Sequence, residues 1–169
     1  MFPVMPGRQN PPYVADERTM LASWLDFQRA TLLHKCAGLD DQQLAARAVP
    51  PSALSLLGIV RHMTDVERTW FRRVLRGEDC PRVHARGQDV GAVDQADAQA
   101  DLDRYRAEVE RCRSALDGST SLDAIAVERR DGVHELSLRW ICVHMVQEYA
   151  RHNGHADLLR ERLDGSTGT

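Results

Sequence analysis

Four side chains that bind metal ions or transfer protons recur at helical spacing near the end of the sequence. They are His144, Glu148, His152 and His155. Steps of three or four residues return to one face of an α-helix, and the apolar residues of this stretch fall on the same face. An unpaired carboxylate or imidazole in an apolar core costs several kcal/mol, so the cluster requires a metal ion, hydrogen bonds or water.

Spacing limits which of these side chains share one ion. Residues four apart lie about 6 Å apart along the helix axis, whereas His144 and His152 lie about 12 Å apart. At most two of the row are therefore ligands: His144 with Glu148, Glu148 with His152, or, less favourably, His152 with His155. A hydrogen-bond network without metal is the alternative explanation.

A third ligand has to come from another helix, and His62 lies on or beside the apolar stripe of an earlier one. A single histidine in such a place is also compatible with a core residue held by hydrogen bonds. His34 lies near a helix end, His84 in a loop and His134 in an irregular segment, so these three are expected to be exposed.

Apolar periodicity predicts four helices that position these residues. They span about 16–36, from just after Ser52 to near Gly77, about 94–116 and about 138–163. Asp16, Ser52 and Ser137 are the expected N-caps of the first, second and fourth of these helices. The connection 77–93 is long, and 121–137 is expected to form a short hairpin turning at Asp131-Gly132 or an extended linker. We predict an all-α four-helix bundle, with up-down-down-up order as reasonable as simple up-down order.

Length, net charge and composition limit the classes of protein to which this chain can belong. The 169 residues carry a formal net charge of −3 and fit a single domain over 1–169, with an extended arm over 1–12 and a flexible tail over 165–169. A net negative charge provides no basic surface for nucleic acid, so DNA binding is disfavoured. Since the sequence has neither a secretory signal nor an apolar run long enough to span a membrane, we expect a cytoplasmic protein. The four cysteines form no C-x-x-C pair, and we expect them and the tryptophans to pack in the core.

Two stretches resemble the DinB/YfiT-like superfamily, and with the first helix the resemblance covers nearly the whole chain. The first is LLGIVRHM (56–63) followed by VERTWF (66–71), and the second is HMVQEYARHNGHAD (144–157). The sequence is most similar to an actinobacterial branch that resembles mycothiol-dependent maleylpyruvate isomerase and mycothiol S-transferases. Homodimers are common among such relatives, and the resemblance therefore implies a homodimer.

The resemblance implies one metal ion, zinc or nickel, bound by His62, Glu148 and His152. Many relatives have histidine in place of Glu148, and glutamate there indicates the thiol-dependent branch. His155 stands where many relatives have glutamine. Two imidazoles and one carboxylate leave an open coordination position, which is typical of catalytic zinc.

We therefore expect mycothiol, a low-molecular-weight thiol, to act as cosubstrate and attack a small electrophile, in a transfer or an isomerisation. His144 and His155 would orient ligands or shuttle a proton. Arg61, Arg82 or Arg151 would bind a carboxylate of the substrate, and the 77–93 connection would cover the pocket.

Three other functions remain open. The open coordination position of the metal could activate water in a hydrolase of small molecules. Two histidines with a carboxylate also form the facial triad of iron oxygenases. A non-catalytic stress-associated or binding protein, stapled by its metal, would close the site with a fourth ligand such as Cys142 or His144.

Overall fold

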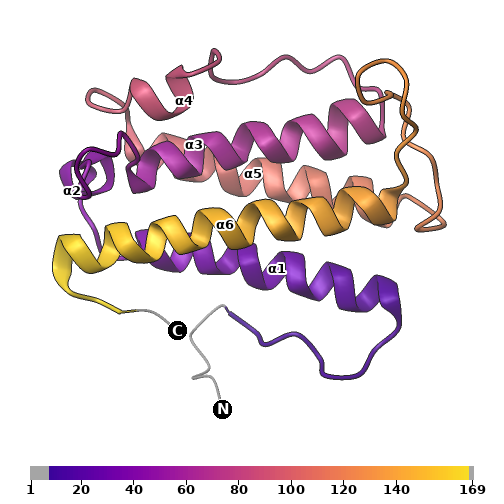
Figure 1. Cartoon of the computed structure of the whole chain (residues 1–169), viewed down its shortest axis with the longest axis horizontal. Coiled ribbons are helices and arrows are strands. Elements are labelled where there is room, and N and C mark those ends of the chain that lie inside the picture. The colour runs from indigo at the N-terminus through magenta and orange to yellow at the C-terminus, as the bar shows by residue number, and fades with distance from the viewer. Residues whose placement is uncertain (1–7, 168–169) are drawn as a thin grey trace.

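Four long helices form the body of the protein in a computed structural model that describes residues 8–167 (Figure 1). They are α1 (Glu17–Cys36), α3 (Leu56–Glu67) continued by the π-helix η1 (Arg68–Leu75), α5 (Ala98–Asp117) and α6 (Leu138–Asp164). In Figure 1, α1 and α6 run in one direction and α3 and α5 in the other. The predicted all-α bundle is confirmed, and its order is up-down-down-up.

Side-chain caps decide where the helices begin. Asp16 and Ser137 cap α1 and α6, as predicted, by accepting from the amides of Thr19 and Trp140. The second and third helices begin later than predicted, at Leu56 and Ala98. Ser52 was the expected cap of the second helix, but its hydroxyl accepts from the Leu54 amide in a turn, and Ser55 takes the capping position instead.

Two short helices lie in the connections: α2 (Asp41–Ala45) and α4 (Gln88–Gly91). Neither helix was predicted from the sequence. A reciprocal capping box between Asp40 and Gln43 starts α2. The left-handed Gly87, at φ 81°, precedes α4 and lets the long connection turn into it.

The interior of the bundle contains polar groups as well as apolar ones. Arg29, Glu67, Tyr105 and Tyr149 each come from a different long helix, and each is buried. The Arg29 guanidinium donates to both oxygens of Glu67, through Nε at 2.7 Å and Nη2 at 2.8 Å. Tyr149 Oη donates to Glu67 Oε1 at 2.7 Å and lies 2.8 Å from Tyr105 Oη. This group, the buried polar quartet, fixes how the four helices face one another.

The segment 121–137 turns where the sequence indicated. Asp131 and Gly132 adopt left-handed backbone angles, with φ of 54° and 72°. The pairs Ile125–Ser137 and Arg130–His134 form isolated antiparallel bridges, without a named strand among the described residues.

The chain ends were expected to be an arm and a tail. Residues 1–7 and 168–169 of these segments lie outside the described residues. Within the described part, 9–16 and 165–167 are not helical. No helix of that part is both long and apolar enough to cross a membrane.

Candidate metal centre

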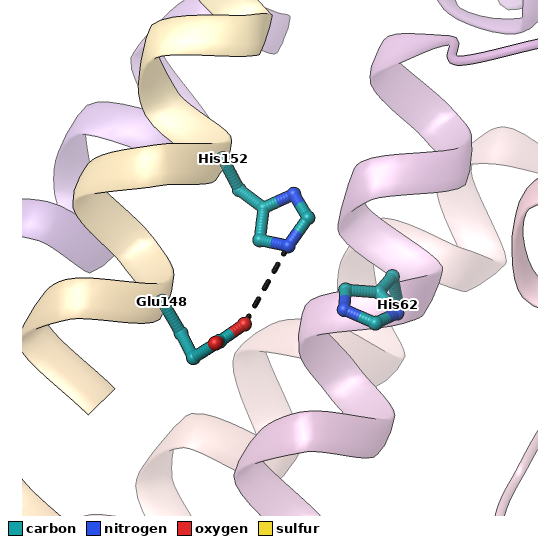
Figure 2. Close-up of side chains that lie close together, drawn as sticks. All are labelled: His62, Glu148 and His152. Atoms are coloured by element: carbon teal, nitrogen blue, oxygen red, sulfur yellow. Dashed lines mark ion pairs between the residues drawn. The ribbon is translucent and has the colours of Figure 1, made fainter. Parts of the chain in front are cut away.

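His62 on α3 meets Glu148 and His152 on α6 (Figure 2). One potential ligand atom from each lies within 4.8 Å of those of the other two. The His62 and His152 rings are 4.8 Å apart between centroids, and His152 Nε2 lies 3.7 Å from Glu148 Oε2. The side chains keep 28%, 14% and 14% of their surface exposed, in the order His62, Glu148, His152. The structure thus brings together the three residues that the resemblance implied.

The donor set fits a divalent cation such as zinc. Ligand bonds of about 2.0–2.2 Å in tetrahedral geometry place donor atoms about 3.4 Å apart, so donor atoms that now lie up to 4.8 Å apart would need to approach by up to about 1.4 Å. Among the described residues, no fourth histidine, cysteine or acidic side chain joins the group. Cys142 is fully buried in the core, where burial raises its pKa to about 11. The arrangement therefore leaves a coordination position for an exchangeable ligand.

The electrostatics of the centre favour neutral imidazole at His152. Burial, followed by the neighbouring His62, lowers the pKa of His152 to about 4, although Glu148 opposes the shift. Neutral imidazole is the form that binds metal ions. The Nδ1 atoms of His152 and His155 are buried and have no hydrogen-bond partner in the described part of the chain. Such atoms are rare in proteins and fit a site completed by a bound group or water.

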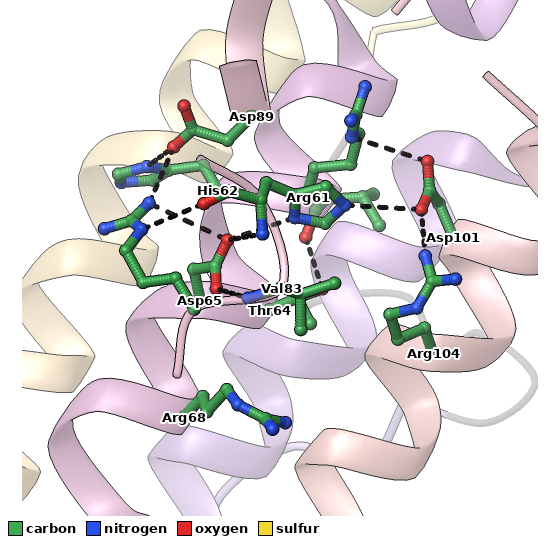
Figure 3. A network of polar contacts seen from close by, with 12 residues as sticks. Arg61, His62, Thr64, Asp65, Arg68, Val83, Asp89, Asp101 and Arg104 are labelled. Carbon is green, nitrogen blue, oxygen red and sulfur yellow. Dashed lines mark hydrogen bonds and ion pairs between the residues drawn. The ribbon is translucent and has the colours of Figure 1, made fainter. Parts of the chain in front are cut away.

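The other side of His62 contacts the long connection (Figure 3). Its Nδ1 lies 3.0 Å from Asp89 Oδ2 on α4, and Arg82 Nη2 lies 3.2 Å from the same oxygen. Burial disfavours the charged form of Asp89, but the hydrogen bond from His62 and the contacts with the Val90 amide and Arg82 keep its pKa below the usual value. Asp89 was not predicted from the sequence, where its only signal was an acidic residue in a long connection.

A model of the family described as Mycothiol-S-transferase matches residues 20–165. The chain belongs to the mycothiol S-transferase family. This confirms the resemblance noted from the sequence, and it supports thiol and small-molecule substrates and a transferase function at the level of the family.

For this member of the mycothiol S-transferase family, a search of curated proteins found no match. A solved structure described as the crystal structure of the conserved protein of locus from Enterococcus faecalis has a TM-score of 0.61 and 14% sequence identity. The match covers 90% of this chain and 100% of that one. At this identity the likeness concerns the fold alone.

In this member of the mycothiol S-transferase family, His144 and His155 lie on α6, on either side of Glu148 and His152. They are the two histidines expected to orient ligands or shuttle a proton. The His155 ring lies 5.4 Å from the His152 ring. His144 packs against two tryptophans instead, with its ring centroid 4.9 Å from that of Trp140 and 4.6 Å from that of Trp70. Burial lowers the pKa of His144.

The three arginines expected to bind substrate lie in different places. Arg151 pairs directly with the candidate ligand Glu148. Arg82 pairs with Asp89, which in turn contacts His62. Arg61 faces α5, where its Nε lies 3.5 Å from Asp101 Oδ2, and it donates to the Ala92 carbonyl. The structure does not bring Arg61 to the centre.

Two predictions of exposure were wrong for histidines. His84 is buried, because its Nδ1 lies 3.0 Å from Asp65 Oδ2 and its Nε2 lies 3.5 Å from Asp101 Oδ1. His34 is half-buried, while His134 is exposed as expected. The position of His84 in a loop gave no sign that the buried carboxylates of Asp65 and Asp101 lie within contact distance of its ring.

The tryptophans were expected in the core and are not fully buried. Trp24 is 41% exposed and Trp140 is 36% exposed, while Trp70 is half-buried. Trp70 and Trp140 lie 5.5 Å apart and form, with His144, an aromatic cluster from η1 and α6.

Proposed function

We propose that the protein is a metal-dependent thiol S-transferase in which His62, Glu148 and His152 hold one divalent cation. The observation that carries this proposal is the convergence of the three donor groups from α3 and α6 within 4.8 Å, with no fourth protein donor among the described residues. Zinc suits this donor set best, and nickel or iron are the other candidates. When bound, the cation would lower the pKa of a thiol that reaches its open position and hold the sulfur as thiolate.

Membership in the mycothiol S-transferase family supports mycothiol as the thiol. In the transfer, the sulfur forms a bond to an electrophilic carbon, and the leaving group departs with its electron pair. The thiol proton passes to solvent or to a nearby base. A rearrangement of the thiol adduct, as in an isomerase, would use the same first step.

The residues around the centre have separate roles in this proposal. His155 is the better placed proton acceptor, because its ring lies beside the candidate ligand His152, whereas His144 packs against Trp70 and Trp140. Arg82 and Arg151 are the candidates for binding an anionic group of thiol or electrophile. Half-buried Trp70 on η1 and the more exposed Trp140 near the start of α6 offer an apolar surface beside His144. The homodimer and the cytoplasmic location expected from the sequence stay predictions.

The test combines metal content with product analysis. Wild type and the variants His62→Ala, Glu148→Gln and His152→Ala are purified without added metal and examined by elemental analysis. Exposed His134→Ala is the matched control. Each protein is then loaded with zinc and incubated with mycothiol and chlorodinitrobenzene, and adduct formation with chloride release is followed by mass spectrometry.

We expect metal-dependent adduct in wild type and His134→Ala, and at least about a tenfold loss in each ligand variant. Absence of metal-dependent adduct in wild type would refute the proposal. Cleavage of nitrophenyl acetate instead would indicate a hydrolase. Tight metal binding with neither reaction would indicate a structural metal.

A further inference from the structure

Asp89 contacts the ring nitrogen of His62 that the candidate centre does not need. His62 Nδ1 lies 3.0 Å from Asp89 Oδ2, which leaves Nε2 as the nitrogen for a cation. We propose that Asp89 is a positioning residue: it holds the proton of His62 on Nδ1 and thereby presents the lone pair of Nε2 to the metal. This inference rests on the proposed function, because it assigns a role toward the same centre.

The Asp89 carboxylate is built into the fold. The residue is 5% exposed, and Arg82 Nη2 lies 3.2 Å from the oxygen that contacts His62 (Figure 3). A carboxylate held from two sides in a buried position fixes the orientation of the ring that it contacts. Metal-binding histidines generally have such a partner on their second nitrogen.

The connection that carries Asp89 is anchored to α3. Asp65, which is fully buried, accepts from the amides of Val83 at 2.7 Å and His84 at 3.1 Å. Its Oδ2 also lies 3.0 Å from His84 Nδ1. Asp65 follows His62 by less than one turn of α3. The same turn of α3 therefore carries the candidate ligand His62 and binds the connection on which Asp89 lies.

A glycine lets α4 approach α3 closely at this point. A Cβ atom on Gly58 would lie 3.3 Å from Val90 Cα and 3.2 Å from Ser55 Oγ, so a larger residue would push the next residue after Asp89 away. Gly58 lies one turn before His62. The close approach therefore places Asp89 beside the imidazole.

The two histidines of the centre differ in this respect. His62 has a carboxylate partner, whereas His152 Nδ1 has no hydrogen-bond partner in the described part of the chain. Loss of Asp89 should therefore affect one ligand selectively. Loss of such a partner weakens metal binding by about 10- to 100-fold in general.

The test compares Asp89→Ala and Asp89→Asn with Asp94→Asn. Asp94 is the control because it lies in the same connection, where it pairs with Arg47 at the surface. Affinity for cobalt(II), a spectroscopic substitute for zinc, is measured by chelator competition, and the visible spectrum of the bound cobalt is recorded. Melting of the metal-free proteins shows whether each variant is folded. Nitrogen-15 NMR of the metal-free proteins at pH 8 reports which nitrogen of His62 carries the proton.

We expect cobalt affinity to fall by about 10- to 100-fold in Asp89→Ala, with an altered spectrum. The loss should be smaller in Asp89→Asn, whose amide oxygen still accepts from Nδ1–H, and absent in Asp94→Asn. If Asp89→Ala does not fold, Asp89→Asn carries the same test. Equal affinities in wild type and both Asp89 variants, or a wild-type His62 protonated on Nε2, would overturn the inference. If wild type binds no cobalt, the metal proposal fails, and the NMR result still decides whether Asp89 orients His62.

Discussion

Tyr149 donates to Glu67 Oε1 at 2.7 Å in the centre of the bundle, and each residue lies on a helix that carries a candidate metal ligand. Tyr149 follows Glu148 directly on α6, and Glu67 lies five residues after His62 at the end of α3. The hydrogen bond therefore joins the two helices that carry the centre. It constrains the rotation of each helix, and so the direction in which the ligands point.

Tyr149→Phe removes this hydrogen bond and the one to Tyr105. We expect the free energy of unfolding to fall by about 1–3 kcal/mol, because buried Glu67 and Tyr105 each lose a partner. Urea denaturation measures the change. Tyr13→Phe is the control, since Tyr13 is 90% exposed, and it should stay within about 0.5 kcal/mol of wild type. Equal effects of the two substitutions would contradict a stabilising role for the contact.

Arg29→Met leaves the buried carboxylate of Glu67 without its cation. Breaking a buried ion pair in this way costs about 3–5 kcal/mol, so the variant should be strongly destabilised. Arg47→Met breaks the exposed pair with Asp94 and should cost about 0–1 kcal/mol. The double variant Arg29→Met/Glu67→Met should recover part of the loss in thermal melting. A double variant less stable than Arg29→Met would argue against this account.

The depressed pKa of His152 predicts a pH dependence of stability. The pKa is about 4 in the folded protein, against about 6.5 in an unfolded chain. Between these values the unfolded chain binds a proton that the folded protein does not bind, so the contribution of His152 to stability falls as pH drops from about 6.5 to about 4. His152→Gln lacks this group. In metal-free protein, the stability of wild type should therefore fall more steeply over this range than that of the variant, as measured by denaturation at each pH. Parallel curves of stability against pH for wild type and variant would show that burial does not lower the pKa of His152.

The aromatic cluster predicts a separable effect on substrate binding. Trp140→Leu removes one face of the stack with His144 and should raise the KM for an aromatic electrophile by about two- to tenfold. Cobalt affinity should not change, because Trp140 does not contact the three candidate ligands. Trp24→Leu is a matched control of similar exposure on α1. An unchanged KM, or the same rise in the control, would exclude the cluster from the substrate site.

Local patterns in the sequence were sufficient for the long helices and for a short set of candidate ligand pairs on the last one. Apolar periodicity predicted the four long helices, and Asp16 and Ser137 were correct as caps because capping depends on residues within one turn. The four-residue step offered Glu148 with His152 as one of these pairs, and the family resemblance selected it. Asp40 and Gln43 form a capping box that would also have indicated α2, so that omission was avoidable.

Tertiary structure decided what depends on residues far apart in the chain. Spacing on α6 allowed either His144 or His152 beside Glu148, and only the packing of α3 against α6 brought His62 to one pair and placed His144 among tryptophans. The partner of His62, the burial of His84 and the buried polar quartet also depend on long-range contacts. Their physical reason is shared: a buried polar group is stable only where another element supplies its partner, and the identity of that element is not encoded in the local pattern.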